Sequence, residues 1–218
     1  MRRPYLDRAA AGRALAEELG QVDGSVLVLG LARGGVPVAA PVADALDADL
    51  DVLIVRKLGL PGQPELAMGA IAGVGDNLHT VRNEHVLKGV NEQALEEVRT
   101  REVRELRRRE HAYRGDRPAI DVRDRVVILV DDGLATGSTM RAAVAAVRRQ
   151  RPARVVVAVP VGGMESCRLL SRVADQVVCA WIPRYFSAVG QAYRDFSAVS
   201  DEEVRRVLAD STARRPGG

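Results

Sequence analysis

Aromatic side chains are scarce in this chain, making up 3% of its 218 residues. An interior built on stacked rings is therefore excluded, and the core has to rest on Val, Leu, Ile and Ala. Such aliphatic residues suit parallel strands that are buried on both faces. The length fits one compact domain with a small appendage. These features predict a single α/β domain.

Cysteine and long apolar runs are also lacking. Cys167 and Cys179 occur without a CxxC pair or a nearby His, so we expect two buried thiols and neither a disulfide framework nor a zinc site. No run of about 18 uncharged apolar residues is present, and the N-terminal segment mixes charged residues with Ala and Leu. We therefore expect no membrane span, no secretion and a cytoplasmic location.

The excess of one charge sign is small, at a formal net charge of +3. Basic runs such as 107–109 are typical of a solvated helix face rather than a nucleic-acid interface. No nucleic-acid partner is expected.

Short apolar runs alternate with helical patterns along the chain. This alternation predicts a parallel sheet with helices on both faces, and ligands bind such sheets beyond the carboxyl ends of the strands. The predicted strands are 25–30, 51–57, 125–130, 154–160 and 176–181, and the predicted helices are 7–20, 35–46, 91–113, 139–149 and 165–173.

Four segments complete this organisation. Residues 58–64 are rich in Gly and Pro and predict a loop, whereas 69–74 and 79–82 predict a hairpin. The helix at 91–113 carries one narrow apolar stripe, so its Glu and Arg residues are expected to be solvated. Residues 211–218 are expected to be a frayed tail.

The segment after the apolar run 126–130 combines two acids with a Gly/Thr loop. Successive backbone N–H groups of such a loop, at the start of a helix, suit a phosphate monoester. Adjacent carboxylates would repel an anion unless they grip hydroxyl groups or a divalent cation, which a sugar phosphate with magnesium supplies. Neither the lysine of a nucleotide-binding P-loop nor a GxGxxG motif is present. The residues concerned are Asp131 and Asp132, followed by the phosphate cradle Ala135, Thr136, Gly137, Ser138 and Thr139.

The stretch VVILVDDGLATGST resembles the phosphoribosyl-pyrophosphate signature of type I phosphoribosyltransferases. The resemblance implies a Rossmann-like parallel sheet with a flexible flap and a small C-terminal hood. It places the core at about 6–181, the flap at 58–82 and the hood at 182–210. It also implies that Asp131 and Asp132 hold the ribose hydroxyls and contact Mg²⁺ indirectly, through ribose or water.

The stretch LGLARGGVP resembles the family's pyrophosphate loop, with Arg33, Gly34 and Gly35 in the key positions. Taken alone, an RGG sequence more often marks a tight turn, but its place after the first strand favours the resemblance. Relatives often have a cis peptide here, which predicts one at Ala32–Arg33. Lys57, at the end of the second strand, is a further pyrophosphate candidate or simply a solvated lysine.

The C-terminal sequence beyond Trp181 is similar to the hood of purine-type members. Trp181 and Phe186 are expected either to stack on a base or to anchor the core under the hood, and Asp195 belongs to the hood pattern. Ala135 stands where 6-oxopurine enzymes carry a third acid, which makes hypoxanthine and guanine less suitable acceptors.

The resemblance implies an enzyme, a pentosyltransferase of nucleotide salvage. It would transfer ribose 5-phosphate from 5-phosphoribosyl-1-pyrophosphate to a nitrogen heterocycle, with Mg²⁺ as cofactor, and act as a homodimer. One alternative is a regulatory or binding protein that retains the ligand site without transfer. Another is phosphorolysis or hydrolysis of a ribosyl compound. The acceptor stays open, because base selectivity depends on a few hood contacts.

Overall fold

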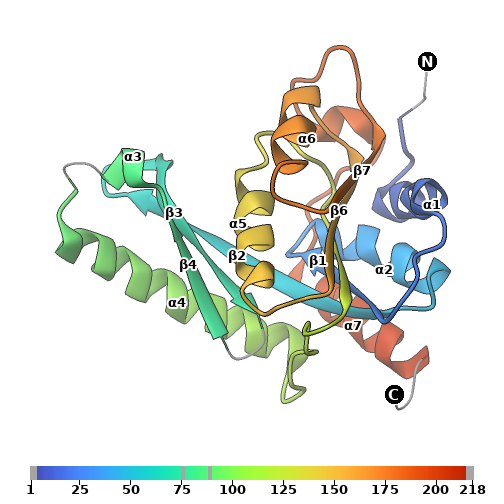
Figure 1. Ribbon diagram of the computed structural model, residues 1–218, viewed down its shortest axis with the longest axis horizontal. Helices are drawn as coiled ribbons and strands as arrows, with labels where there is room; N and C mark the ends of the chain where they lie inside the picture. The colour runs from blue at the N-terminus through green and yellow to red at the C-terminus, as the bar shows by residue number, and fades with distance from the viewer. Residues whose placement is uncertain (1–3, 75–76, 88–89, 215–218) are drawn as a thin grey trace.

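The computed structural model describes residues 4–74, 77–87 and 90–214 (Figure 1). Within them the strands form one seven-stranded sheet of order β4-β3-β2-β1-β5-β6-β7. The pairs β1–β2, β1–β5, β5–β6 and β6–β7 are parallel, whereas β2–β3 and β3–β4 are antiparallel. The strands are β1 Val26–Leu31, β2 Asp49–Leu60, β3 Gln63–Val74, β4 Asn77–Arg82, β5 Val126–Val130, β6 Arg154–Val161 and β7 Gln176–Trp181.

Helices cover both faces of this sheet (Figure 1). One aliphatic core joins the sheet to α1, α2, α4 and α7, and a second core joins it to α5 and α6. Every residue of β1 and β5 is buried, as expected for strands covered on both faces. The predicted fold class is confirmed. The helices are α1 Arg8–Leu19, α2 Gly35–Ala45, α3 Glu84–Leu87, α4 Glu92–Arg114, α5 Ser138–Arg148, α6 Met164–Leu170, the 3₁₀ helix η1 Val189–Ala192 and α7 Asp201–Arg214.

The loop predicted at 58–64 is wrong. Strand β2 continues to Leu60 and β3 begins at Gln63, so only a tight turn separates them. Gly62 supplies the positive φ of 80° in that turn. The pairing is irregular on both sides of Gly59, which is how the ladder accommodates a glycine-rich sequence. The predicted hairpin is present as β3 and β4.

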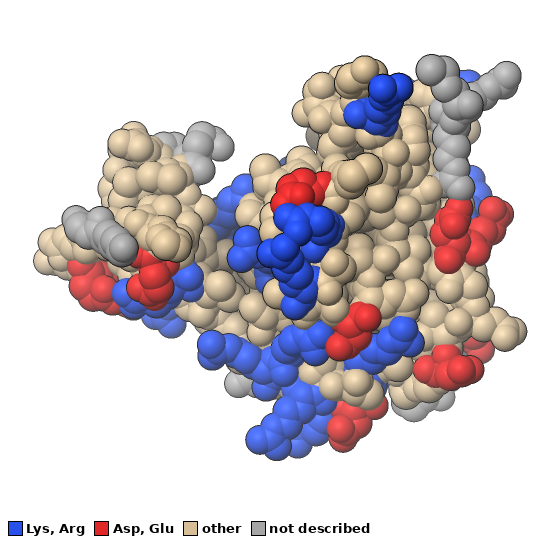
Figure 2. Space-filling view, turned by 45° about the horizontal axis from the view of Figure 1, so that its top comes forward, with Lys and Arg blue, Asp and Glu red and all other residues tan. Residues whose placement is uncertain are grey.

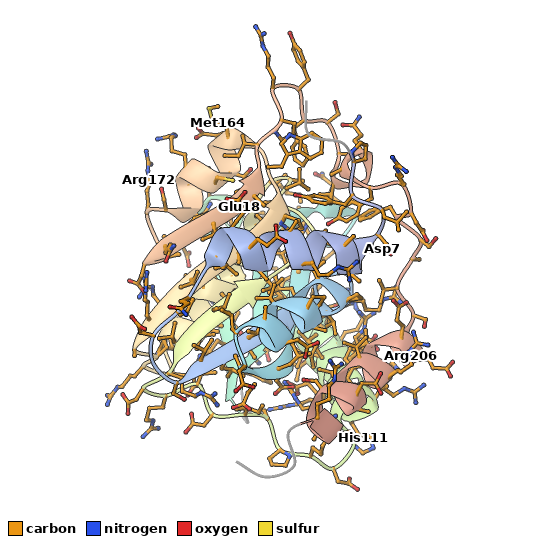
Figure 3. All side chains as sticks on the ribbon, turned by 90° about the vertical axis from the view of Figure 1, so that its right-hand side faces the viewer. Asp7, Glu18, His111, Met164, Arg172 and Arg206 are labelled. Atoms are coloured by element: carbon orange, nitrogen blue, oxygen red, sulfur yellow. The ribbon has the colours of Figure 1, made fainter. Side chains whose placement is uncertain are left out.

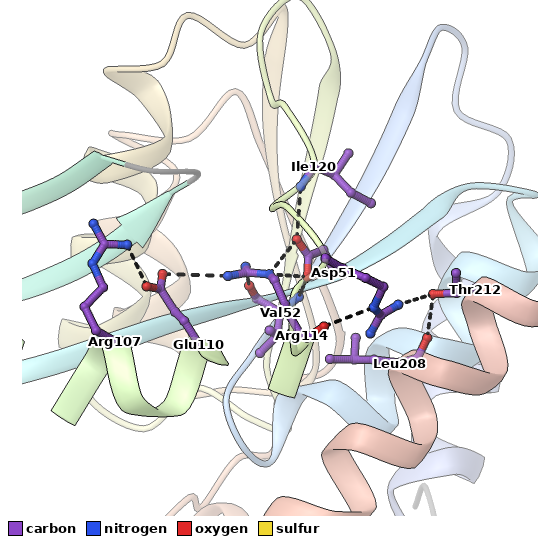
Figure 4. Close-up of polar contacts among 9 residues, drawn as sticks. Asp51, Val52, Arg107, Glu110, Arg114, Ile120, Leu208 and Thr212 are labelled. Carbon is purple, nitrogen blue, oxygen red and sulfur yellow. Dashed lines mark hydrogen bonds and ion pairs between the residues drawn. The ribbon is translucent and has the colours of Figure 1, made fainter. Parts of the chain in front are cut away.

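The expectation that the charges of α4 are all solvated is also wrong. Glu102 and Glu110 are buried, and the Arg114 side chain is only 9% exposed. Arg114 donates from Nε to both carboxylate oxygens of Asp51 on β2, at 2.9 and 3.1 Å (Figure 4). Glu102 accepts from Arg56, also on β2. These charges are buried because each meets a partner of opposite sign.

The C-terminal segment differs from the prediction as well. Helix α7 continues to Arg214 and packs Val204 and Leu208 into the same core as α2 and α4. The expected tail is therefore helical up to 214, and 215–218 lie outside the described residues. The hood boundaries 182–210 thus include part of a core helix. The predicted flap, 58–82, contains 75–76, which also lie outside the described residues.

Two expectations from composition meet the structure with different results. Cys167 and Cys179 are free; Cys167 is buried as expected, whereas Cys179 is only partly buried. Among the described helices, none is long and apolar enough to cross a membrane.

Candidate active site

The candidate site lies where the strand order reverses. From β1 the chain proceeds to β2 on one side, and it later returns to place β5 on the other side, with Gly30 paired to Val130. Ligands of open α/β sheets bind at such a switch point, beyond the carboxyl ends of the strands. The loop after β1 carries Arg33, Gly34 and Gly35, and the loop after β5 begins with Asp131 and Asp132. The structure brings these two predicted motifs together.

The paired glycines are required by the closeness of the two loops. A Cβ atom on Gly34 would lie 2.1 Å from Oδ2 of Asp132, and one on Gly35 would lie 2.4 Å from the carbonyl oxygen of Val130. Neither distance leaves room for a side chain. The peptide bond between Ala32 and Arg33 is cis, as predicted. The RGG sequence therefore marks a direct contact with the acidic pair.

The two aspartates differ in the charged groups around their carboxylates. Burial and repulsion from Asp132 raise the pKa of Asp131 well above its ordinary value. Burial also raises the pKa of Asp132, but the Arg8 guanidinium opposes that rise. Both Nε and Nη2 of Arg8 lie 2.9 Å from Oδ2 of Asp132. The site thus holds two carboxylates and one compensating cation.

The segment after Asp132 is anchored at its ends and open in the middle. The N–H of Leu134 donates to Val161 at the end of β6 (2.9 Å), and Ser166 on α6 donates to the carbonyl of Ala135. Gly137 precedes α5 with φ of 73°, a conformation that glycine adopts without strain, and within the described residues the side-chain acceptor at the helix start is Thr136 Oγ1, 3.5 Å from the Ser138 nitrogen. This contact is at the limit of hydrogen-bond length, so the N–H groups at the start of α5 are only weakly engaged and can bind an anion. Exposed hydroxyl groups of Thr136 and Ser138 lie 3.3 Å apart beside them.

A cleft of about 610 Å³ lies between the second half of β2, its turn towards β3 and helix α4. Ala32, Lys57 and Thr139 line it, so the loop after β1, strand β2 and the start of α5 share one space. Arg56 in the same cleft is paired with Glu102 at 2.6 Å. Among the described residues no ion pair or hydrogen bond engages the exposed Lys57 side chain, which leaves it the available cation.

Arg33 lies at the predicted loop, but its guanidinium faces α7. Its Nη1 is 3.7 Å from Oδ1 of Asp201, which also accepts a hydrogen bond from the Tyr113 hydroxyl at 2.8 Å. Desolvation and this hydrogen bond raise the pKa of Tyr113 to about 12. The pairing of Arg33 is long and solvated, so it holds the side chain only weakly.

A second groove, of about 790 Å³, separates α5 from the hairpin β3–β4. Figure 2 shows Lys and Arg side chains beside the notch that separates the hairpin lobe, at the left, from the rest of the molecule. Lys57 and Arg141 line the groove, and Lys57 also lines the cleft described above. The two spaces therefore meet at Lys57, beneath the hairpin.

The predicted hood residues do not form one surface. Trp181 lies edge-on to Tyr5 with ring centroids 6.4 Å apart, and Phe186 packs into the same small apolar cluster. This packing is that of core anchors, one of the two roles expected for them. Asp195 is exposed and accepts from the N–H and hydroxyl of Ser197, so it stabilises a local turn. Its hydrogen bonds with Ser197, and to a lesser extent the Arg8 guanidinium that pairs with Asp132, lower the pKa of Asp195.

The residues of the site fit a magnesium ion that is held largely by other groups. Within the described residues there is no cluster of three or more His, Cys, Asp or Glu arranged to hold a metal. Mg²⁺ usually keeps several waters and binds through one or two carboxylates plus substrate phosphates. Asp131 and Asp132 match that limited requirement.

Sequence reasoning did not predict that Arg8, Ser166 and Tyr193 hold the acidic loop in place; the Tyr193 hydroxyl donates to the carbonyl of Asp132. Ser166 carries no local signal, and the hood pattern contains Tyr193 without revealing this hydrogen bond. Arg8 does carry a local signal, because a cation in the first turn of α1 opposes the helix dipole and needs a nearby anion.

Comparisons with known proteins agree with this geometry. The family model described as "Phosphoribosyl transferase domain" matches residues 5–182. Two Mycobacterium tuberculosis proteins, each named "Putative phosphoribosyl transferase", are 47% identical over 201 residues. That match covers 91% of this chain and 45% of each relative, so the chain spans about half the length of these relatives.

Solved structures extend the comparison. The crystal structure of TT1426 from Thermus thermophilus has a TM-score of 0.81 and 43% sequence identity, covering 95% of this chain and 98% of that chain. The purine phosphoribosyltransferase from Pyrococcus horikoshii has a TM-score of 0.44 and 18% identity, covering 92% and 99%. That second likeness is too low to bear on the acceptor.

Proposed function

The chain belongs to the phosphoribosyl transferase domain family, and on this premise we propose that it is a magnesium-dependent phosphoribosyltransferase. It would transfer ribose 5-phosphate from 5-phosphoribosyl-1-pyrophosphate to a nitrogen heterocycle. The observation that carries the proposal is the direct contact of Gly34 with Asp132, which joins the two ligand loops at the switch point. Nucleotide salvage and a homodimer belong to the same proposal.

In the proposed complex each loop takes one part of the substrate. The N–H groups and hydroxyls of 135–139 hold the 5-phosphate at the start of α5, where the helix dipole favours negative charge. Asp131 and Asp132 accept hydrogen bonds from the two ribose hydroxyls. The 33–35 loop, which follows Ala32 at the edge of the cleft, and Lys57 within the cleft hold the pyrophosphate.

The protein then acts by position and charge. The acceptor nitrogen forms its bond to C1 as the bond between C1 and the pyrophosphate oxygen breaks. Positive charge develops on the ribose ring at that moment, and the carboxylates of Asp131 and Asp132 stabilise it. When bound, Mg²⁺ neutralises charge on the leaving pyrophosphate. The hairpin β3–β4 excludes water from the cleft.

The proposal is tested by pyrophosphate release from magnesium phosphoribosyl pyrophosphate across purines, pyrimidines and smaller nitrogen heterocycles. We expect release with one acceptor class, and a loss of at least about a hundredfold in an Asp131→Asn, Asp132→Asn variant. A matched control replaces Asp121 and Asp124, two exposed aspartates just before β5, by Asn. The control is expected to release pyrophosphate like the wild type.

The outcomes separate transfer from ligand binding without transfer, two of the functions that the sequence leaves open. Release that survives the double variant at the site would contradict the proposed roles of both aspartates. Tight binding of the ligand without release, for every acceptor in the panel, would instead support a binding or regulatory protein.

A further inference from the structure

Arg8 is the strongest unassigned feature of the site. It lies in the first turn of α1, whose start is marked by Asp7 in Figure 3. Its side chain is 11% exposed, and its Nε and Nη2 both lie 2.9 Å from Oδ2 of Asp132, which is itself 16% exposed. The remaining nitrogen, Nη1, donates to the carbonyl of Ser197 at 2.7 Å. All three nitrogens of the guanidinium therefore have a partner.

The contacts of Arg8 join three distant parts of the chain. Its guanidinium carbon lies 4.1 Å from the ring centroid of Phe196, which stacks on Tyr193 at 5.0 Å. The hydroxyl of Tyr193 donates to the backbone carbonyl of Asp132. Arg8 thus holds the carboxylate of Asp132 and Tyr193 holds its backbone carbonyl, while Phe196 contacts both Arg8 and Tyr193.

This arrangement is costly for folding alone. An arginine in the first turn opposes the helix dipole, and burying a guanidinium requires full pairing. Leucine or methionine there would pack against Phe196 without either cost. The carboxylate of Asp132 has a reciprocal need, since it lies beside Asp131. Arg8 and Asp132 each neutralise a charge that the fold alone does not need, which points to a role of this ion pair in ligand binding.

One oxygen of Asp132 stays available. Both Arg8 contacts reach Oδ2, and among the described residues no side chain donates to Oδ1. The backbone N–H of Asp132 also acts to lower the pKa of this carboxyl, and its own 2.9 Å hydrogen bond goes to Oδ1 of Asp131. A carboxylate oxygen that is already oriented through its neighbour accepts a hydroxyl without a further loss of side-chain freedom.

We propose that Arg8 is a positioning residue for ribose binding, which fixes Asp132 through Oδ2 and leaves Oδ1 to accept a hydroxyl of the bound sugar phosphate. This inference rests on the proposed function and deepens it. Arg8 acts through Asp132 and does not touch the phosphate cradle. Its loss is therefore specific to ligands that carry the ribose.

Calorimetric titrations of the full chain test this assignment. With Arg8→Met we expect phosphoribosyl pyrophosphate in the presence of magnesium to bind about tenfold more weakly or worse, the usual cost of a lost charge-assisted hydrogen bond. Inorganic phosphate, which needs only the cradle, is expected to bind unchanged. Arg8→Lys keeps the positive charge but loses the planar guanidinium. Its affinity for phosphoribosyl pyrophosphate is expected to lie between those of the wild type and Arg8→Met. Arg13→Met, an exposed position on the same helix, is the matched control.

A second variant guards against misfolding. Phe196→Leu removes the stacking surface but leaves Arg8 charged, and a smaller loss in the same direction is expected. Folded Arg8→Met that binds the sugar pyrophosphate like wild type would overturn the assignment, as would an equal loss of phosphate binding. If the wild-type chain binds phosphate but not phosphoribosyl pyrophosphate, the proposed function itself fails.

Discussion

Asp131 occupies a position where its negative charge costs stability. Burial and Asp132 raise its pKa, so the folded protein keeps this proton at pH values where the unfolded chain has lost it. The free energy of unfolding therefore falls as the pH rises from the ordinary carboxyl range towards the raised pKa. Below both pKa values the two states bind the proton equally, and the penalty vanishes.

Replacing this carboxyl should stabilise the protein. We expect Asp131→Asn to raise the free energy of unfolding at pH 7 by about 0.5 to 2 kcal/mol, a common size for such gains at functional sites. At pH 3 the difference should be small. Urea denaturation at several pH values measures both. The exposed Asp116→Asn is the control, and equal destabilisation of both variants at pH 7 would show that Asp131 carries no penalty.

The sequence predicted Asp131 and Asp132 as site residues, but it did not predict that Arg8 holds Asp132 in place. Asp131 and Asp132 stand in a contiguous motif after an apolar run, and that local pattern predicted a ligand-binding role for them. Arg8 is 124 positions away from Asp132 in the chain. Its role depends on how α1 packs, which no local pattern contains.

Helix α4 is held to the sheet by buried charge as well as by its apolar stripe. Asp51 accepts from Arg114 and from the N–H groups of Val52 and Ile120, while Arg114 also donates to the carbonyl of Val52 (Figure 4). The ion pair thus joins β2, the end of α4 and the segment that leads to β5. Removing one partner would leave a buried charge without compensation.

We expect Arg114→Met to lower the free energy of unfolding by about 3 to 5 kcal/mol. The matched control is Arg108→Met on the exposed side of the same helix, whose pairing with Glu105 is solvated and contributes about 1 kcal/mol or less. Urea denaturation compares the two. Addition of Asp51→Asn to Arg114→Met should recover part of the loss, and a loss no larger than that of the control would contradict a structural role for the pair.

Element prediction succeeded where one local pattern dominates. The strands that begin at 154 and 176 follow from apolar runs, and they are confirmed. The segment after Lys57 failed because pairing between β2 and β3 overrides the glycine and proline signals. The charges of α4 were misjudged because their partners lie on a strand that periodicity within the helix cannot reveal.

For the whole molecule, the family and the parallel sheet were predicted correctly, because the signature after β5 joins a strand, an acidic pair and a helix start in one stretch. The sheet order was not available from that stretch. The placement of β5 beside β1, which creates the site, depends on long-range packing. The two spaces that meet at Lys57 likewise arise only from the assembled fold.

The hairpin β3–β4 lines the groove beside α5, and this groove shares Lys57 with the cleft, so ligand in the cleft should restrain the hairpin. We expect saturating magnesium phosphoribosyl pyrophosphate to slow amide hydrogen exchange about tenfold or more at the turn after Leu60 and along β3, because a covering segment loses its open states when it closes on ligand. The last two turns of α7, far along the chain from the flap, serve as the internal reference.

Lys57 provides the specific control for this closure. Since it lines both spaces, Lys57→Met should reduce the ligand-induced slowing while exchange without ligand stays the same. Slowing confined to the hairpin and diminished in the variant fits a cover that responds to the pyrophosphate charge. Unchanged exchange in the hairpin at full occupancy would show instead that residues 58–82 are a fixed extension of the sheet, and that the reaction must be shielded from water by another part of the molecule.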